Sequence, residues 1–155
     1  MNAMTARALL VGLLVAVWVW VIGVARLHVA GWAGVVALGC YFAAGGGVSG
    51  LQKTVLGTLS GIVWVLLADA VRIAIGGNPI VNALILGAMV CALVLQSRVP
   101  FLSFTAGAFA GAGVALGLGV NTVTEAIRAG GALAVGAVLG FVAERVAGAI
   151  GARRG

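Results

Sequence analysis

Long apolar runs, separated by single charged residues, are the main pattern of this chain. Eighteen uncharged residues lie between Arg7 and Arg26, and 25 lie between Arg72 and Arg98. A helix that crosses a bilayer needs about 20 mostly apolar residues, and charged side chains near its ends can reach the interface. The pattern therefore predicts six membrane-spanning helices, near residues 8–25, 30–50, 54–72, 79–97, 101–119 and 126–145.

The length of these runs also decides the fold class. Strands of a membrane barrel have about 10 residues each, which is much shorter than the runs found here. A helix pairs all of its backbone amides internally, as the hydrocarbon core requires. We expect an all-α fold, a polytopic membrane helix bundle that forms one integral membrane domain over residues 1–155. Pro79 and Pro100 flank the fourth run, and "GGNP" at 76–79 predicts a turn before it.

Composition excludes a soluble globular protein. Hydrophobic residues make up 63% of the chain and charged residues only 8%, whereas a soluble domain has about 25% charged residues. The first apolar run could instead be a signal peptide, because it follows a basic N-terminal segment. Trp18 and Trp20 stand where small residues would precede a cleavage site. We therefore expect this run to be retained as a membrane helix.

Lysine and arginine positions predict the orientation. With six spans and a cytoplasmic N-terminus, six basic residues face the cytoplasm and three face outward, which favours cytoplasmic termini at both ends. The inner set is Arg7, Lys53, Arg98, Arg145, Arg153 and Arg154, and the outer set is Arg26, Arg72 and Arg128. Dual topology is the alternative. The net charge of +6 is spread singly over helix ends, so we expect the lipid bilayer, and not nucleic acid, as the partner.

Glycines spaced four apart predict close helix packing. Small residues at this spacing let two backbones approach each other in lipid. The predicted packing positions are Gly57, Gly61, Gly107, Gly111, Gly113, Gly117, Gly136 and Gly140. Two interpretations are open: tight packing within or between protomers, or thin helices that keep a narrow lumen open. For the lumen, the candidate pathway-lining residues are Tyr41, Phe42, Ser49, Thr58, Ser60, Ser103, Phe104 and Thr105.

Two of these stretches are expected at the same depth. "YFAAG" at 41–45 and "SFTAG" at 103–107 share Phe, Ala and Gly at matching positions. One stretch ends a predicted helix and the other begins one, so they do not support an inverted repeat. Both lie at the cytoplasmic end of the predicted topology. We expect their aromatic rings and hydroxyls to form a constriction there.

Ionisable residues are expected only near helix ends. Asp69 and Arg72 are three apart and can pair on one helix face, and Glu125 and Arg128 repeat this spacing. Glu144 lies near the inner end of the last helix. We expect structural pairs at the interface, with gate latches as the alternative. Ion-coupled transport usually needs an ionisable residue near mid-membrane, so this pattern favours a passive route for an uncharged solute.

Catalytic chemistry has little support in the sequence. The only histidine, His28, is expected in a loop, and the two cysteines, Cys40 and Cys91, lie in separate apolar runs as small buried hydrophobes. "AGGG" at 44–47 lacks the Lys and Ser/Thr of a nucleotide-binding loop. We expect no enzymatic activity, no cofactor, no disulfide and no metal site.

Four fragments in order resemble a known family. They are "GWAG" at 31–34, "GCYF" at 39–42, "LSGIVW" at 59–64 and "FLSFTAGAFAG" at 101–111. Together they resemble the small bacterial inner-membrane proteins of the YcdZ type, domain of unknown function 1097, over about residues 8–145. The resemblance implies a bacterial inner-membrane location and no particular activity. The family has prolines near positions 45 and 106. Gly45 still permits a helix break, whereas Ala106 favours a continuous helix.

These observations together predict a function class. We expect a small homo-oligomeric channel or facilitator for a small polar or neutral solute. The alternative is a non-transporting membrane scaffold or a regulatory subunit of a partner complex. A polar cavity through each protomer or along a symmetry axis would separate the two.

Overall fold

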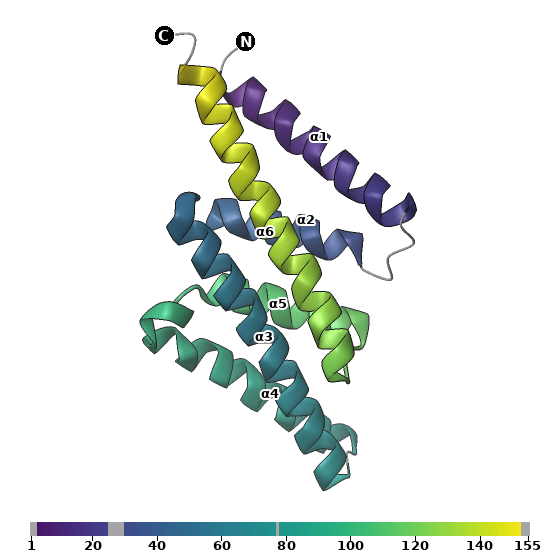
Figure 1. Cartoon of the computed structure of the whole chain (residues 1–155). Coiled ribbons are helices and arrows are strands. Elements are labelled where there is room, and N and C mark those ends of the chain that lie inside the picture. Colours follow the sequence, from purple (N-terminus) through teal and green to yellow (C-terminus); the bar gives the residue numbers. More distant parts are fainter. Residues whose placement is uncertain (1–2, 25–29, 77, 153–155) are drawn as a thin grey trace.

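The computed structural model describes residues 3–24, 30–76 and 78–152, and these ranges are almost entirely helical (Figure 1). The helices are α1 (Ala3–Val24), α2 (Gly31–Ala43), α3 (Gly47–Ile75), α4 (Pro79–Leu95), α5 (Thr105–Leu118) and α6 (Val123–Ala152), with the 3-10 turns η1 (Gln96–Arg98) and η2 (Pro100–Leu102) after α4. No strand occurs in the described ranges. The prediction of an all-α membrane helix bundle is confirmed.

The helices differ in length more than the sequence pattern predicts. Three stretches are long and apolar enough to cross a membrane, namely Gly47–Ile75, Pro79–Arg98 and Val123–Ala149, while Ala8–Val24, Gly31–Ala43 and Thr105–Leu118 are apolar but shorter. A 13-residue helix such as α2 is about 20 Å long, less than the hydrocarbon core of about 30 Å. The six-span topology therefore stays a prediction.

The helices α2 and α5 begin or end away from the predicted bounds. The predicted span at 30–50 is interrupted, because α2 ends at Ala43 and α3 begins at Gly47. Gly45, Gly46 and Gly47 have positive φ of 94°, 69° and 65°, a conformation that glycine adopts without steric cost. Near the predicted span at 101–119, Pro100 opens η2, and α5 starts only at Thr105.

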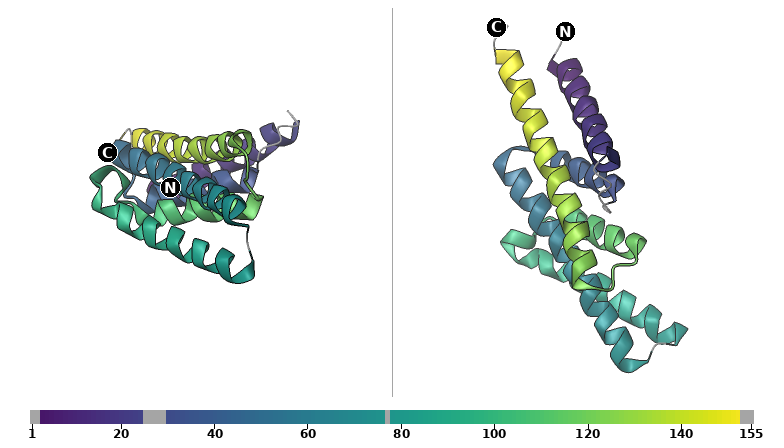
Figure 2. Two further views of the ribbon diagram at one scale, coloured as in Figure 1. Left: turned by 90° about the horizontal axis from the view of Figure 1, so that it is seen from below. Right: turned by 45° about the vertical axis from the view of Figure 1, so that its right-hand side comes forward.

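The described helices form two sets of three, and in each set the middle helix is the shortest. Figures 1 and 2 show α3 and α6 running in opposite directions through the centre, with α2 and α5 lying across them. The short α5 packs mainly on α3, and the short α2 packs mainly on α6. The outer helices follow the same rule, since α4 packs on α3 and α1 packs on α6. Exchanging the first three helices with the last three therefore reproduces the packing.

Residue contacts support the same internal symmetry. Gly61 of α3 lies against the Ala108 carbonyl of α5, and Gly136 of α6 lies against the Gly34 carbonyl of α2. Gly61 and Gly136 are 75 residues apart, and Gly34 and Ala108 are 74 apart. At the 75-residue shift α3 and α6 share further identical pairs: Val48 with Val123, Val63 with Val138, Ala68 with Ala143, Val71 with Val146, and Ala74 with Ala149. The chain thus consists of two halves of opposite direction, an inverted repeat of the kind found in many transporters.

Small residues set the distance between the central helices. A Cβ at Gly61, Gly111 or Gly136 would collide with a backbone carbonyl of the helix that it faces. Gly113 has no such neighbour, and Gly117 lies only near the Trp32 ring. The buried core around these contacts is rich in alanine, including Ala33, Ala37, Ala108, Ala112, Ala115, Ala132 and Ala137. The central helices can therefore pack backbone against backbone.

Candidate functional site

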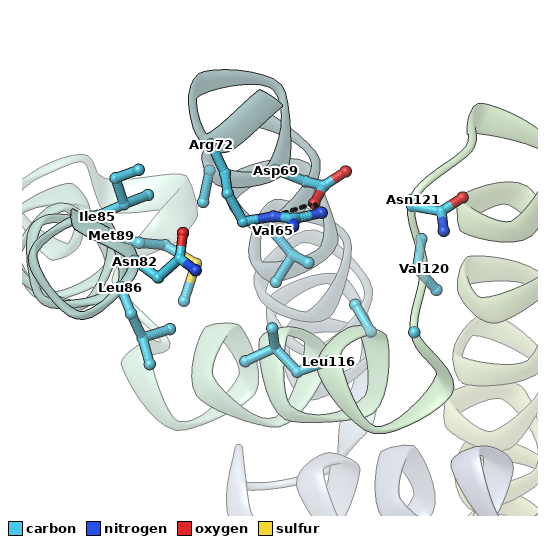
Figure 3. Close-up of a pocket in the computed structure, with 13 residues that line it drawn as sticks. Val65, Asp69, Arg72, Asn82, Ile85, Leu86, Met89, Leu116, Val120 and Asn121 are labelled. Atoms are coloured by element: carbon cyan, nitrogen blue, oxygen red, sulfur yellow. Dashed lines mark hydrogen bonds and ion pairs between the residues drawn. The ribbon is translucent and has the colours of Figure 1, made fainter. Parts of the chain in front are cut away.

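A cavity of about 440 Å³ lies between the C-terminal part of α3, the α4 helix and the end of α5 (Figure 3). Asp69, Arg72, Asn82 and Asn121 supply its polar side chains. The apolar part of the lining includes Val65, Ile85, Leu86, Met89, Leu116 and Val120. We call this space the Asp69 cavity. Its mixed lining is typical of small-molecule sites, in which a few polar groups orient a ligand against apolar walls.

The polar groups of α3 form an ion pair on the cavity wall. Arg72 donates from Nε and Nη2 to Asp69 Oδ1, at 2.9 and 2.5 Å. The Asp69 side chain is 16% exposed and the Arg72 side chain 50%. The predicted Asp69–Arg72 pairing is confirmed. Both bonds go to Oδ1, and no hydrogen bond to Oδ2 is found within the described residues, so the carboxylate keeps an acceptor for another donor.

Two asparagines from other elements also line the cavity. Asn82 lies one turn into α4, whose start is fixed by Pro79 and by the Asn78 side chain, which accepts from Val81 N at 2.9 Å. Asn82 Oδ1 is buried and has no hydrogen-bond partner in the described part of the chain. Asn121 reaches the cavity because Gly119, at φ 65°, turns the chain out of α5. Buried polar groups normally have partners, so the free Asn82 oxygen is a further candidate contact for a ligand.

A second polar cluster lies at the other end of α3. The Tyr41 hydroxyl donates to Glu144 Oε2. The Gly47 N–H donates to the Tyr41 hydroxyl oxygen and to Glu144 Oε2, each at 2.8 Å. Tyr41 is fully buried, and its ring lies on Gly140, where an added Cβ would be 2.6 Å from Tyr41 Cδ1. Glu144 thereby places its carboxylate at the N-terminus of α3, where the helix dipole favours a negative charge. The cluster ties α2, α3 and α6 together.

Thr58 and Ser60, two of the predicted pathway residues on α3, form hydrogen bonds. Thr58 is buried and donates to Thr54 O at 2.8 Å. Ser60 donates to Gly57 O at 2.7 Å and accepts from Gln96 Nε2 at 3.1 Å. Ser49 is exposed at the start of α3. These hydroxyls therefore face three different surroundings.

The remaining predicted pathway residues also separate. Tyr41 packs against α6, and its ring meets the Phe42 ring edge-on, with 5.3 Å between the two ring centroids. Phe104 instead places its carbonyl beside Gly57 of α3 and its ring beside Gly107. Ser103 is exposed and donates to Pro100 O at 2.9 Å, and Thr105 is half-buried at the start of α5. The two aromatic groups of the predicted constriction thus lie in different helix interfaces.

Other predicted positions differ from the structure in smaller ways. Glu125 forms a capping box with Thr122 at the start of α6, with Thr122 N donating to Glu125 Oε2 at 3.2 Å and Glu125 N to Thr122 Oγ1 at 3.3 Å. Cys91 is exposed on α4, so the prediction of a buried position for it is wrong. It belongs to the apolar outer surface of α4, which faces away from the bundle. His28 lies outside the described residues.

The sequence did not indicate Asn82 or Asn121 as site residues, and it did not predict the hydrogen bonds that Glu144 accepts. One signal was available for Asn82, since it is the only amide or charged side chain between Pro79 and Leu95. Asn121 and Glu144 gave no comparable signal. Their roles depend on a left-handed glycine after α5 and on a turn between α2 and α3 that the apolar pattern does not reveal.

Comparison with known proteins gives relatives over most of the chain. Inner membrane protein YcdZ of Salmonella typhimurium is 32% identical over 113 residues, which cover 72% of this chain and 69% of the relative. Inner membrane protein YcdZ of Escherichia coli is 31% identical over 113 residues, covering 72% of this chain and 68% of the relative. No solved structure matches the chain significantly.

A family model matches residues 8–148, which include all of the described helices except the ends of α1 and α6. The description of that family is "Protein of unknown function (DUF1097)". The apolar helices and the two relatives support a place in the bacterial inner membrane. The chain belongs to the DUF1097 family.

Proposed function

We propose that this protein is a small membrane channel or facilitator for a small polar or neutral solute, and that it acts as a homo-oligomer. The inverted repeat with two short crossing helices is the observation that carries this proposal. In many transporters, inverted repeats build the solute site at their interface from helices that do not span the membrane continuously. Here α2 and α5 have the short length, and each packs on the long helix of the other half.

The charge distribution supports an uncharged solute. Ionisable residues of α3 and α6 lie toward the helix ends, while Gly61 and Gly136 lie near their middles. An ion crossing the centre of the bundle would lose its hydration shell without a compensating charge. The Asp69–Arg72 pair also leaves the Asp69 cavity without net charge from these two residues.

The short helices also support assembly of several copies. Gly39 of α2 and Gly113 of α5 are exposed, and a Cβ at either would meet no atom within 4 Å. The two positions are 74 residues apart and so are counterparts in the two halves. Open small positions on thin helices let a second copy approach closely.

Solute flux into liposomes tests the proposal. We expect liposomes that contain the purified protein to take up glycerol or urea faster than protein-free liposomes of the same lipid and size, measured by light scattering after an osmotic step. Potassium and sodium conductance across the same membranes should stay at the protein-free level. If no member of a panel of small neutral solutes enters faster, the facilitator proposal fails and the scaffold alternative takes its place.

A further inference from the structure

We propose that the Asp69 cavity binds an uncharged small molecule that carries a hydroxyl donor on a compact apolar body. This inference deepens the proposed function by assigning the solute site and its chemistry. The observation that supports the proposal is the internal symmetry of the fold, which relates the Asp69 cavity at the end of α3 to the Tyr41–Glu144 cluster at the start of α3.

The counterparts of the two places follow from the repeat. Glu144 is the counterpart of Asp69, and Gly140 is the counterpart of Val65, both at the 75-residue shift of α3 and α6. Tyr41 is the counterpart of Ala115, at the 74-residue shift that relates Gly34 to Ala108. Asp69, Val65 and Ala115 all line the Asp69 cavity. The three counterpart positions, Tyr41, Gly140 and Glu144, form the Tyr41–Glu144 cluster.

The two places differ most at the pair Tyr41 and Ala115, while Val65 and Asp69 also stand in place of Gly140 and Glu144. At the start of α3, the Tyr41 ring fills the space over Gly140 and its hydroxyl donates to the Glu144 carboxylate. At the end of α3, alanine replaces tyrosine, and the space beside Val65 and Asp69 is a cavity of about 440 Å³. The fold therefore carries, at the start of α3, a bonded example of what the end of α3 leaves open: a hydroxyl on an apolar body, held by a carboxylate.

The lining of the Asp69 cavity fits such a molecule. Asp69 Oδ1 accepts both bonds from Arg72, so Oδ2 can accept the hydroxyl of a ligand. Asn82 Oδ1, which has no partner in the described chain, can accept a second donor. Leu86, Met89 and Leu116 offer an apolar surface for the body of the molecule. Arg72 disfavours a cation and Asp69 disfavours an anion, so an uncharged ligand is selected.

Binding of p-cresol, the side-chain analogue of tyrosine, tests this site directly. The full chain in detergent is titrated with p-cresol by calorimetry, and 4-methylbenzoate serves as the charged analogue. We expect one saturable p-cresol site per chain and no saturable 4-methylbenzoate binding. Asp69→Asn should weaken p-cresol binding about tenfold or more, because a hydrogen bond to a charged acceptor is lost.

Variants that fill the cavity provide the sharper comparison. Ala115→Tyr places the tyrosine of the first half into the second half and should abolish saturable binding. Leu86→Trp fills the same space from α4, in case Ala115→Tyr does not fold. Leu84→Trp is the matched control, because Leu84 is 68% exposed and lies outside the cavity lining. All variants are compared in the same detergent, so that partition of p-cresol into micelles cancels.

The outcomes separate this site from the proposed function. Loss of saturable binding in Leu86→Trp, with binding retained in Leu84→Trp, supports the site. Absence of saturable binding to the unsubstituted protein, or equal binding in all folded variants, overturns it. Since the measurement is of binding and not of flux, liposomes without solute flux would overturn the facilitator proposal while leaving a positive binding result intact.

Discussion

At the scale of single residues, backbone contact at glycine decides how closely the central helices pack. Gly111 faces the Thr58 carbonyl, and Gly136 faces the Gly34 carbonyl, so neither site has room for a side chain. We expect Gly111→Leu and Gly136→Leu to destabilise the fold by more than the roughly 1–3 kcal/mol of ordinary overpacking, because a backbone, and not a flexible side chain, must move. Thermal unfolding and gel filtration in detergent measure the effect.

Gly131 is the matched control for these substitutions. It lies on α6, five residues before Gly136, and a Cβ there would meet no atom within 4 Å. Gly131→Leu should leave the unfolding temperature and the elution volume close to those of the unsubstituted protein. Equal tolerance of leucine at all three glycines would contradict the close packing of the central helices.

The Tyr41–Glu144 cluster gives a second prediction at this scale. Tyr41→Phe removes one hydroxyl but leaves the Gly47 N–H bonded to Glu144, so we expect a loss of about 1–2 kcal/mol. Glu144→Ala should cost more, because both the Tyr41 hydroxyl and the Gly47 N–H lose their carboxylate acceptor. Unfolding in a denaturing detergent series ranks the stability of the two variants. A smaller loss of stability for Glu144→Ala than for Tyr41→Phe would contradict the stabilising role of the Tyr41–Glu144 cluster.

At the scale of elements, the turn between α2 and α3 makes α2 short. Gly45 has φ 94° and no atom near an added Cβ, so only backbone strain opposes substitution there. Gly45→Asn should therefore be tolerated better than Gly45→Val, by about 1–2 kcal/mol, because asparagine adopts positive φ more readily than a β-branched residue. Comparison of their unfolding midpoints tests this, and equal midpoints would indicate that α2 continues past Ala43.

The sequence predicts the helical class and the Asp69–Arg72 pair, and the family resemblance allows a helix break at Gly45, but the apolar pattern predicts neither this turn nor the repeat. In a chain with 26 glycines, a short glycine run does not distinguish a helix break from a packing face. The repeat is hidden for a similar reason, since its identical pairs are mostly valine, alanine and glycine, which recur in any membrane helix. The pairs Asp69 with Glu144 and Lys53 with Arg128, each 75 apart, are the more specific signal. The cavity is apparent only in three dimensions, where Ala115 leaves open the space that the Tyr41 ring fills at the other end of α3.

At the scale of the whole molecule, the inverted repeat fixes which ends lie together. Because α3 and α6 run in opposite directions (Figure 2), the start of α3 lies beside Glu144 on α6, and the end of α3 lies beside Asn121. If the protein has the orientation predicted from its basic residues, the Tyr41–Glu144 cluster faces the cytoplasmic side. The Asp69 cavity then faces the outer side.

Cysteine labelling tests this orientation in a background with Cys40→Ser and Cys91→Ser. Ser49→Cys lies at the exposed start of α3, and Asn78→Cys lies at the turn between α3 and α4. A membrane-impermeant maleimide added to spheroplasts should label Asn78→Cys at once and Ser49→Cys only after the membrane is permeabilised, because opposite ends of α3 face opposite sides. Immediate labelling of both positions in similar amounts would indicate dual topology. Labelling of Ser49→Cys alone would reverse the orientation and place the Asp69 cavity on the cytoplasmic side.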